Sequence, residues 1–192
     1  MEYKFKTEPY AHQLKALGAS HNKENYALFM EMGTGKSKVL VDNIAMLYDK
    51  GKINAALIVA PKGVYRNWER QEIPIHMPDH IVHNVVTWSP VTTKKQQKEN
   101  LKLFKHGEQL TIFLMNIEAF STVKGLDIAK RFLLAHQALM AIDESTTIKS
   151  PTARRTKNVL KLRNYAKYRR ILTGSPVTKS PLDLYTQCYF LD

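Results

Sequence analysis

The sequence predicts an α/β fold in which helices cover both faces of a mainly parallel sheet. Three features carry this prediction: short apolar runs that alternate with amphipathic stretches, a glycine-rich turn after the first run, and an acidic pair after a later one. Apolar runs of about four to eight residues rich in Val, Ile and Leu are typical of strands that are covered on both faces. Helical patterns between such runs place the chain in the α/β class.

The predicted elements follow one another without an internal repeat or a Gly/Ser-rich linker. Residues 36–48 form a helix-like segment that carries Val39, Leu40, Ile44 and Leu47 on one face, and residues 128–135 form another. The predicted strands are residues 26–30, 55–60, 81–88, 110–115, 138–142 and 170–172.

Length and composition indicate one globular domain. The chain has 192 residues, 44% hydrophobic and 24% charged, which is an ordinary balance for a folded domain. Its single cysteine, Cys188, excludes an intrachain disulfide and a thiolate zinc cluster, and its apolar neighbours predict a buried, inert thiol. No apolar run reaches the roughly 18 residues of a membrane span, and the first residues lack the apolar core of a signal peptide. We therefore expect a soluble, intracellular protein.

Basic residues are in excess and are unevenly distributed. Lys and Arg number 29 against 17 Asp and Glu, which gives a formal net charge of +12. Lysine and arginine bind polyanions by releasing condensed counterions, so nucleic acid is the predicted partner. The alternative is a solvated face that only keeps the protein in solution. The basic clusters are Lys149, Arg154, Arg155, Lys157, Lys161, Arg163, Lys167, Arg169 and Arg170, with no acid among them, and Lys94, Lys95, Lys98, Lys102 and Lys105, with Glu99 alone.

A glycine-rich turn, residues 31–37, follows a predicted strand and precedes a predicted helix. This is the context of a phosphate loop, whose glycines let backbone N–H groups face phosphate oxygens at the positive end of a helix. Lys36 is expected at the β- and γ-phosphates, and the Ser37 hydroxyl on Mg²⁺. The strict pattern has one more glycine, where this sequence has Met30; the alternative is a turn that merely caps a helix. The predicted nucleotide-binding residues of the turn are Met32, Gly33, Thr34, Gly35, Lys36 and Ser37.

An acidic pair, Asp143-Glu144, ends the apolar run that begins at Leu139. A phosphate loop needs a carboxylate at the end of a neighbouring strand, and ligands of open α/β sheets bind at that edge. We expect the Ser37 hydroxyl to bind Mg²⁺ and Asp143 to orient the water ligands of the same ion. We expect Glu144 to position the attacking water. Lys36, Asp143 and Glu144 are therefore the predicted catalytic residues, and the alternative for the acidic pair is a solvated strand end.

These motifs and others occur in an order that resembles the first motor lobe of superfamily 2 helicases. More narrowly, the set is similar to Swi/Snf-type translocases on double-stranded DNA, in the compact form of bacteria and phages. The resemblance covers the chain from Pro9 to Leu191. The matching segments are residues 9–13, 31–37, 57–62, 67–69 (Asn-Trp-Glu), 114–118, 143–149, 172–176 and 182–191.

The resemblance implies a RecA-like fold, ATP and Mg²⁺ as ligands, and hydrolysis coupled to movement along DNA. Gln13 would contact the adenine base. The DNA backbone would be held, without base reading, at Pro61, Lys62, Asn116 and Thr173. By the same resemblance, Thr173, Gly174 and Ser175 would couple ATP hydrolysis to movement.

Three positions depart from the family pattern. Thr146 stands where the commonest form has His, and Ser150 and Lys179 replace asparagines. None of these changes removes a predicted metal ligand or catalytic acid, so they bear on coupling rather than on ATP binding.

The resemblance further implies that residues 1–192 form the first of two RecA-like lobes, with the second lobe, which supplies an arginine finger, absent from this chain. We expect a piece of a longer translocase, and the alternative is a natural single-lobe protein. Alone, the chain should bind nucleotide but hydrolyse ATP very slowly. We expect a monomer of the bacterial or infected-host cytoplasm, with no membrane partner.

Three other functions stay open at this point. They are a nucleotide-gated nucleic-acid-binding module without productive turnover, a lobe of an RNA helicase, and an unrelated phosphate-loop enzyme such as a small-molecule kinase. The Asn-Trp-Glu and Asp143–Lys149 segments favour the DNA branch, by resemblance. Trp68 and Trp88 are expected in the core rather than stacked on bases.

Overall fold

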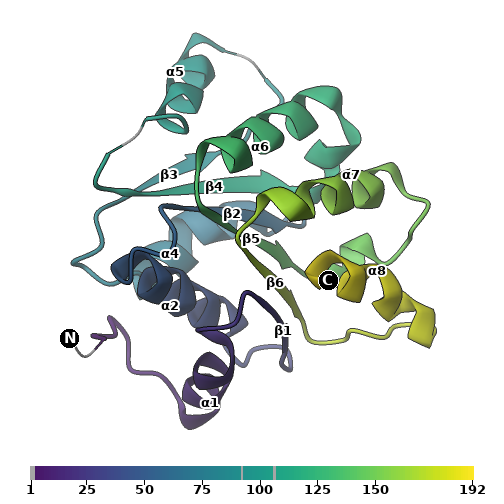
Figure 1. Cartoon of the computed structure of the whole chain (residues 1–192), viewed down its shortest axis with the longest axis horizontal. Helices are drawn as coiled ribbons and strands as arrows, with labels where there is room; N and C mark the ends of the chain where they lie inside the picture. Colours follow the sequence, from purple (N-terminus) through teal and green to yellow (C-terminus); the bar gives the residue numbers. More distant parts are fainter. Residues whose placement is uncertain (1–2, 92, 106) are drawn as a thin grey trace.

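The computed structural model describes residues 3–91, 93–105 and 107–192, and a six-stranded sheet forms its centre (Figure 1). The strand order is β1-β6-β5-β2-β4-β3, and every neighbouring pair is parallel. All six predicted apolar runs are strands, so the predicted fold class is confirmed. The strands are β1 (Asn25–Phe29), β2 (Ala55–Ala60), β3 (His83–Thr87), β4 (Leu110–Asn116), β5 (Ala138–Asp143) and β6 (Tyr168–Thr173).

Helices cover both faces of the sheet, as predicted. On one face, Leu17 of α1 and the apolar side of α2 pack on alternate residues of β2, β4 and β5. On the other face, Phe132 of α6, Val159 of α7 and Phe190 of α8 pack on the residues between them. The helices are α1 (Ala11–Ser20), α2 (Lys36–Asp49), α3 (Tyr65–Asn67), α4 (Ile73–His76), α5 (Lys94–Lys102), α6 (Val123–Ala135), α7 (Arg154–Leu162) and α8 (Tyr185–Leu191), with a π-helical turn, η1 (Trp68–Glu72), between α3 and α4.

Two predicted helices can be compared with these bounds. The predicted segment 36–48 agrees with α2, whereas α6 begins five residues before the predicted start at Ile128. The earlier start has a local cause, because the Thr122 hydroxyl accepts a hydrogen bond of 3.0 Å from the Gly125 N–H and so caps the helix. No helix among the described residues combines the length and apolar character that a bilayer span requires.

The strand that carries the acidic pair is not the neighbour of the phosphate-loop strand, and this part of the prediction was wrong. Strand β6 lies between them, with Thr173 beside Phe29 of β1 and Leu172 beside Asp143 of β5. Neighbouring strands are about 4.8 Å apart, so the ends of β1 and β5 are separated by roughly 10 Å. Both strands still end at the same edge of the sheet, because all six run parallel.

Two arginines of the predicted basic surface are structural instead. Arg170 is fully buried, and Arg169 is half-buried with its guanidinium on three backbone carbonyls at the end of the chain and of α7. Burial lowers the pKa of Arg170 to about 10, so this side chain is still charged at neutral pH. Its guanidinium joins β6 to α1 and α2 through hydrogen bonds to Asn43 Oδ1 and to the carbonyls of Ser20, Lys23, Glu24 and Arg169, all between 2.7 and 3.0 Å.

The cysteine prediction was also wrong, and the tryptophan prediction is confirmed. Cys188 is exposed, because α8 turns Thr186, Gln187 and Phe190 inward and leaves the intervening side of the helix to solvent. Trp68 and Trp88 are both buried.

Replacement of Arg170 by methionine should destabilise the fold strongly. The substitution keeps a long apolar stem but leaves buried carbonyl groups without a donor, and each such loss costs about 1–3 kcal/mol. We expect the free energy of unfolding in urea to fall by at least about 3 kcal/mol. Arg154→Met is the matched control, because Arg154 is exposed on α7, and it should change stability by less than about 0.5 kcal/mol. A similar small effect at both positions would contradict the structural role of Arg170.

Candidate nucleotide-binding site

The phosphate loop connects β1 to α2, and its shape depends on two glycines. Gly33 and Gly35 have φ of 74° and 80°, in the left-handed region that glycine adopts without steric cost. At Gly35 there is a second requirement, because a Cβ there would lie 2.2 Å from Gln13 Nε2. Gly35 is also the residue that precedes the first turn of α2, so the loop directs backbone N–H groups outward at the positive end of a long helix.

Lys36 lies across this loop. Its side chain is mostly buried, and its ammonium donates to the carbonyls of Met30 and Glu31, both at 3.0 Å. Met30, at the position of the missing glycine, has no positive φ, and its N–H continues the β1–β6 pairing by donating to the Thr173 carbonyl at 3.3 Å. A side chain is therefore tolerated there, and the departure from the strict pattern has no steric consequence.

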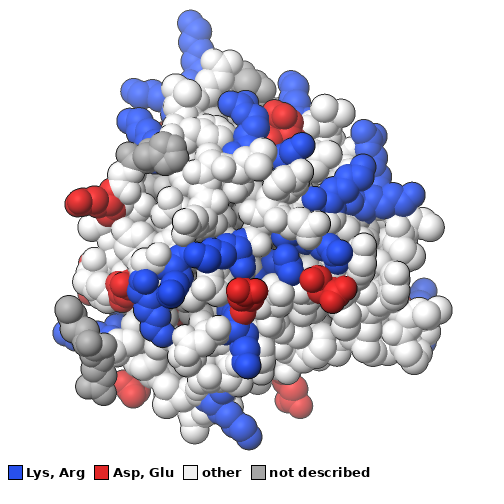
Figure 2. Space-filling view, in the orientation of Figure 1, with Lys and Arg blue, Asp and Glu red and all other residues white. Residues whose placement is uncertain are grey.

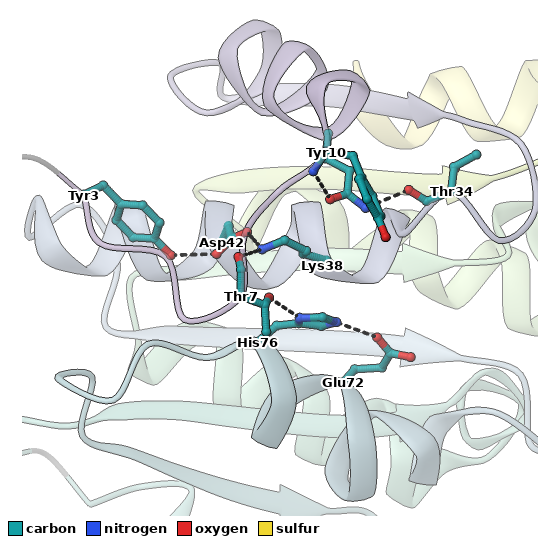
Figure 3. Close-up of polar contacts among 9 residues, drawn as sticks. Tyr3, Thr7, Tyr10, Thr34, Lys38, Asp42, Glu72 and His76 are labelled. Carbon is teal, nitrogen blue, oxygen red and sulfur yellow. Dashed lines mark hydrogen bonds and ion pairs between the residues drawn. The ribbon is translucent and has the colours of Figure 1, made fainter.

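Gln13 fixes the segment before α1 against the phosphate loop, and its two partners, Tyr10 and Thr34, are labelled in Figure 3. Its Oε1 accepts from the Tyr10 N–H and its Nε2 donates to the Thr34 carbonyl, both at 3.0 Å. The side chain is buried, and a cavity of about 510 Å³ lies beside it, lined in part by Tyr10, Gly33 and Gly35. Gln13 thus lines this cavity together with the phosphate loop, and its own amide is already bound within the chain.

Asp143 lies at the end of β5 with both carboxylate oxygens occupied. Trp68 Nε1 donates to Oδ2 and the Glu144 N–H donates to Oδ1, each at 3.0 Å. Burial raises the pKa of Asp143, while the Trp68 hydrogen bond and the positive charge of Lys36 act in the opposite direction. Lys36 and Asp143 therefore interact electrostatically at one edge of the sheet.

Glu144 has a strained backbone. With φ of 49° it is the one non-glycine residue with positive φ among the described residues, and such conformations persist where the surroundings impose them. Its Oε2 lies 3.5 Å from Thr173 Oγ1, and the same hydroxyl accepts from the Ser175 N–H at 3.2 Å. A Cβ at Gly174 would lie 3.2 Å from the Met32 N atom. The predicted coupling residues thus touch both the acidic pair and the phosphate loop.

Three side chains at this edge were not assigned a role from the sequence. Trp68 belongs to a motif that was recognised, but its bond to Asp143 was not foreseen. Glu72, in the same π-helical turn, accepts a hydrogen bond of 3.3 Å from Asn67 Nδ2. Gln187 is fully buried, accepts from the Ser145 hydroxyl at 2.6 Å and donates to the Pro176 carbonyl at 2.9 Å. It therefore joins the segment after the acidic pair to the segment after Thr173.

The residues at this edge fit a magnesium ion bound with a nucleotide. Asp143 is buried and Glu72 is half-buried, and burial together with the negative charge of Asp143 raises the pKa of Glu72. Ser37 lies in the first turn of α2, directly after the loop, and hydroxyl and carboxylate oxygens are ligands that Mg²⁺ prefers. No group of three His, Cys, Asp or Glu side chains suited to a metal ion occurs in the described part of the chain, so phosphate and water oxygens would complete the coordination.

Comparison with known proteins shows which family the chain belongs to. The sequence pattern of the SNF2-related domain matches residues 12–192. The chain belongs to the SNF2-related domain family. No curated protein sequence matches it significantly.

Solved structures agree with the fold of this SNF2-related chain. One similar structure is the Sulfolobus solfataricus SWI2/SNF2 ATPase core in complex with dsDNA, at a TM-score of 0.75 and 21% identity, over 100% of this chain and 37% of that one. Another is the UvsW helicase from bacteriophage T4, at a TM-score of 0.66 and 12% identity, over 96% of this chain and 58% of that one. The six-stranded parallel sheet is that of a RecA-like ATPase core, and the SNF2-related chain spans about a third to three fifths of the length of these structures.

The residues predicted to hold DNA differ in their accessibility in the SNF2-related chain. Lys62 is exposed and Pro61 is half-buried after β2. Asn116 is buried, with its Oδ1 accepting from the Ala119 N–H at 2.8 Å, and Thr173 is buried against Glu144. The side chains of Asn116 and Thr173 face the protein interior, so a DNA strand lying here would contact neighbouring residues or the backbone instead.

Basic side chains cover much of one face of the SNF2-related chain. Figure 2 shows them over α5, beside α7 and in a band across the middle, with few acidic side chains between them. Helix α5 buries none of its residues, and Lys94, Lys95 and Lys98 are exposed along it. The predicted cluster at α5 is therefore available to a polyanion, in contrast to Arg170.

Replacement of Gly35 by alanine should unfold the phosphate loop locally and destabilise the chain. The left-handed backbone alone costs an alanine about 1–2 kcal/mol, and the new Cβ would displace the Gln13 amide. Gly18→Ala is the control, since Gly18 lies within α1 with nothing near its Cβ position, and this change should add about 0.5–1 kcal/mol of stability. Urea unfolding of both variants checks the opposite signs, and a neutral Gly35→Ala would contradict the loop geometry described here.

Proposed function

We propose that this chain is the first motor lobe of an ATP-dependent translocase that moves along or remodels double-stranded DNA. The observation that carries the proposal is that Lys36, Asp143, Glu144 and Thr173 all lie at one edge of the sheet in a chain of the SNF2-related family. A motor lobe needs these groups together, because phosphoryl transfer depends on positioning and on charge stabilisation rather than on covalent chemistry.

The proposed reaction is hydrolysis of the γ-phosphate of ATP. The N–H groups of the loop from Met32 to Ser37 hold the phosphates, and the Lys36 ammonium exchanges its two carbonyl acceptors for β- and γ-phosphate oxygens. Mg²⁺, held by Ser37 and through water by Asp143, would neutralise phosphate charge as it develops. Gln13 and Tyr10 line the side of the loop where the adenine would lie.

Glu144 is the proposed residue that positions and polarises the attacking water. Its strained backbone directs the carboxylate toward Thr173, and this contact is the proposed link between hydrolysis and movement, with Gly174 and Ser175. Full turnover would require an arginine finger from a second lobe, which is worth about 10³–10⁵ in rate. We therefore propose that the chain alone binds nucleotide and hydrolyses it very slowly.

DNA is the proposed track. The strand order supports this, because β1, β6 and β5 end in nucleotide-site residues, whereas β2 and β4 end beside Pro61-Lys62 and Asn116, farther along the same edge. One similar structure, from Sulfolobus solfataricus, is a complex with dsDNA. Contacts to phosphates by exposed lysines would hold the duplex without reading its sequence. We propose a monomeric, cytoplasmic protein in which the second lobe is the main protein partner.

Two substitutions separate nucleotide binding from turnover. Lys36→Ala removes the positive charge at the phosphates, so we expect loss of ATP binding by this chain and of ATPase activity in the protein with both lobes. Glu144→Gln preserves the shape of the site, so we expect ATP binding within about two-fold of the unchanged protein, with DNA-stimulated hydrolysis reduced by at least about 10². Fluorescent-nucleotide titration and phosphate release measure the two effects. Full hydrolysis by Glu144→Gln would show that Glu144 does not have the proposed role, and rapid DNA-stimulated turnover by residues 1–192 alone would remove the need for a second lobe.

Duplex DNA binding should be strongly salt-dependent, with a specific contribution from Lys62. Each phosphate contact adds about 0.9 to the slope of log K against log salt concentration, so Lys62→Gln should reduce that slope by about 1 on any sequence. Lys52→Gln is the matched control, because Lys52 is an exposed lysine before β2, at the opposite edge of the sheet, and should leave the slope unchanged. Titrations with duplex DNA, single-stranded DNA and RNA at several salt concentrations test this. Tighter binding of RNA than of duplex DNA would favour an RNA helicase instead.

A further inference from the structure

A buried ion pair in α2 holds segment 3–9, which precedes α1 (Figure 3). The Lys38 ammonium donates to Asp42 Oδ2 and to the backbone carbonyl of Thr7, both at 2.8 Å. The side chains of the pair are only 5% and 2% exposed. The other carboxylate oxygen of Asp42 accepts from the Tyr3 hydroxyl at 2.9 Å. One pair of charges therefore joins α2 to segment 3–9 at two points.

Segment 3–9 has further contacts with the rest of the chain. Tyr3 and Phe5 pack against the hydrophobic core, with their rings edge to face and 4.8 Å between the centroids. The Thr7 hydroxyl lies 2.8 Å from His76 Nδ1, so the segment also contacts α4. These contacts fix the backbone of the segment against two helices, α2 and α4.

The end of segment 3–9, together with Tyr10, forms one side of the cavity of about 510 Å³ beside the phosphate loop. Gly33 and Gly35 of the loop form another side, and Lys38 also lines the cavity. Its volume is in the range of roughly 300–1,000 Å³ that is typical of small-molecule pockets. A nucleotide whose phosphates lie on the loop would have its nucleoside within reach of this cavity.

Lys36 and Lys38 are directed to different parts of this site. Two residues of an α-helix are rotated by about 200° from each other, so their side chains leave α2 in nearly opposite directions. The Lys36 ammonium lies on carbonyls of the phosphate loop, whereas the Lys38 ammonium lies on the carbonyl of Thr7. The second lysine therefore acts on segment 3–9 and not on the loop.

Stability alone does not account for the buried pair. Removal of two charges from water is costly, and replacement of a buried ion pair by apolar residues of similar size is often neutral or stabilising. An apolar pair, however, could bond neither the carbonyl of Thr7 nor the hydroxyl of Tyr3. What the charges add is a defined position for segment 3–9.

We propose that Lys38 and Asp42 are positioning residues for the nucleoside of the bound nucleotide, because they hold segment 3–9 in place as one side of the cavity that receives it. The inference rests on the proposed function, since it concerns the same ATP. It divides the site into two parts. Lys36 and the loop bind the triphosphate, and the buried pair, through segment 3–9, decides the affinity for the nucleoside.

The test compares the binding of ATP with that of inorganic tripolyphosphate, which offers the phosphates without a nucleoside. Calorimetric titrations of residues 1–192 in Mg²⁺ measure both affinities. The double variant Lys38→Met/Asp42→Leu removes both charges together and leaves no unpaired charge in the core. We expect its affinity for ATP to fall about ten-fold or more, because the segment is no longer ordered before binding, with the affinity for tripolyphosphate within about three-fold. Its unfolding temperature without ligand should stay within about 3 °C or rise.

Two single variants complete the test. Tyr3→Phe removes only the hydroxyl that donates to Asp42, so it should lower the ratio of ATP affinity to tripolyphosphate affinity in the same direction, by about two-fold or more. Lys6→Gln is the matched control, because Lys6 belongs to the same segment but forms a surface ion pair with Asp79, at 2.6 Å. Surface pairs contribute little, so this variant should change neither the ratio nor the unfolding temperature.

The other outcomes identify which claim fails. An unchanged affinity ratio in the double variant would overturn the role of the pair and leave the proposed function intact. Equal losses of affinity for both ligands, with a clear fall in unfolding temperature, would assign the pair to the fold alone. If the double variant does not fold, an unchanged ratio in Tyr3→Phe overturns the inference. Equal affinities of the unchanged chain for the two ligands would show that the cavity does not receive the nucleoside, and failure to bind either ligand would overturn the proposed function itself.

Discussion

The pairing of β6 with β1 on one side and β5 on the other holds the candidate site together. At its carboxyl end, β6 supplies the Thr173 carbonyl to Met30 and the Thr173 hydroxyl to Glu144, so one residue touches both halves of the site. Near its middle, the same strand buries Arg170, whose guanidinium fastens it to α1 and α2. The phosphate loop leads directly into α2, and Gln13 lies on α1. A single strand therefore fixes the loop, the acids and the helices behind them in one rigid arrangement.

The sequence was sufficient for the fold class and for the residues of the loop and the acidic pair. Strands covered on both faces are continuous apolar runs, so the fully buried strands β2, β4 and β5 stand out in the sequence. The glycines of a phosphate loop are required by backbone geometry that few residues can adopt. Strand order could not be read in the same way. It is decided by which helices cover which face, and the local sequences of β5 and β6 carry no mark of their neighbours.

Burial of polar groups was the other point that sequence patterns missed. Arg170 was counted with the basic surface because four of its five acceptors come from segments far away in the chain. Cys188 was placed inside because its neighbours are apolar, but the helical period of α8 turns it outward. The contacts of Trp68 with Asp143 and of Gln187 with Ser145 join residues 75 and 42 positions apart, so they exist only after folding.

The π-helical turn makes the spacing between Trp68 and Glu72 as important as their identity. In an α-helix each residue is rotated by about 100° from the one before, and η1 holds one residue more than an α-helical turn of the same rise. Loss of a single residue, such as Arg70 or Gln71, would restore regular geometry and swing either the indole or the carboxylate away from the sheet edge. This short helix can therefore accept many changes of side chain on its outer side, while a change of its length by one would separate the Trp68 indole from Asp143.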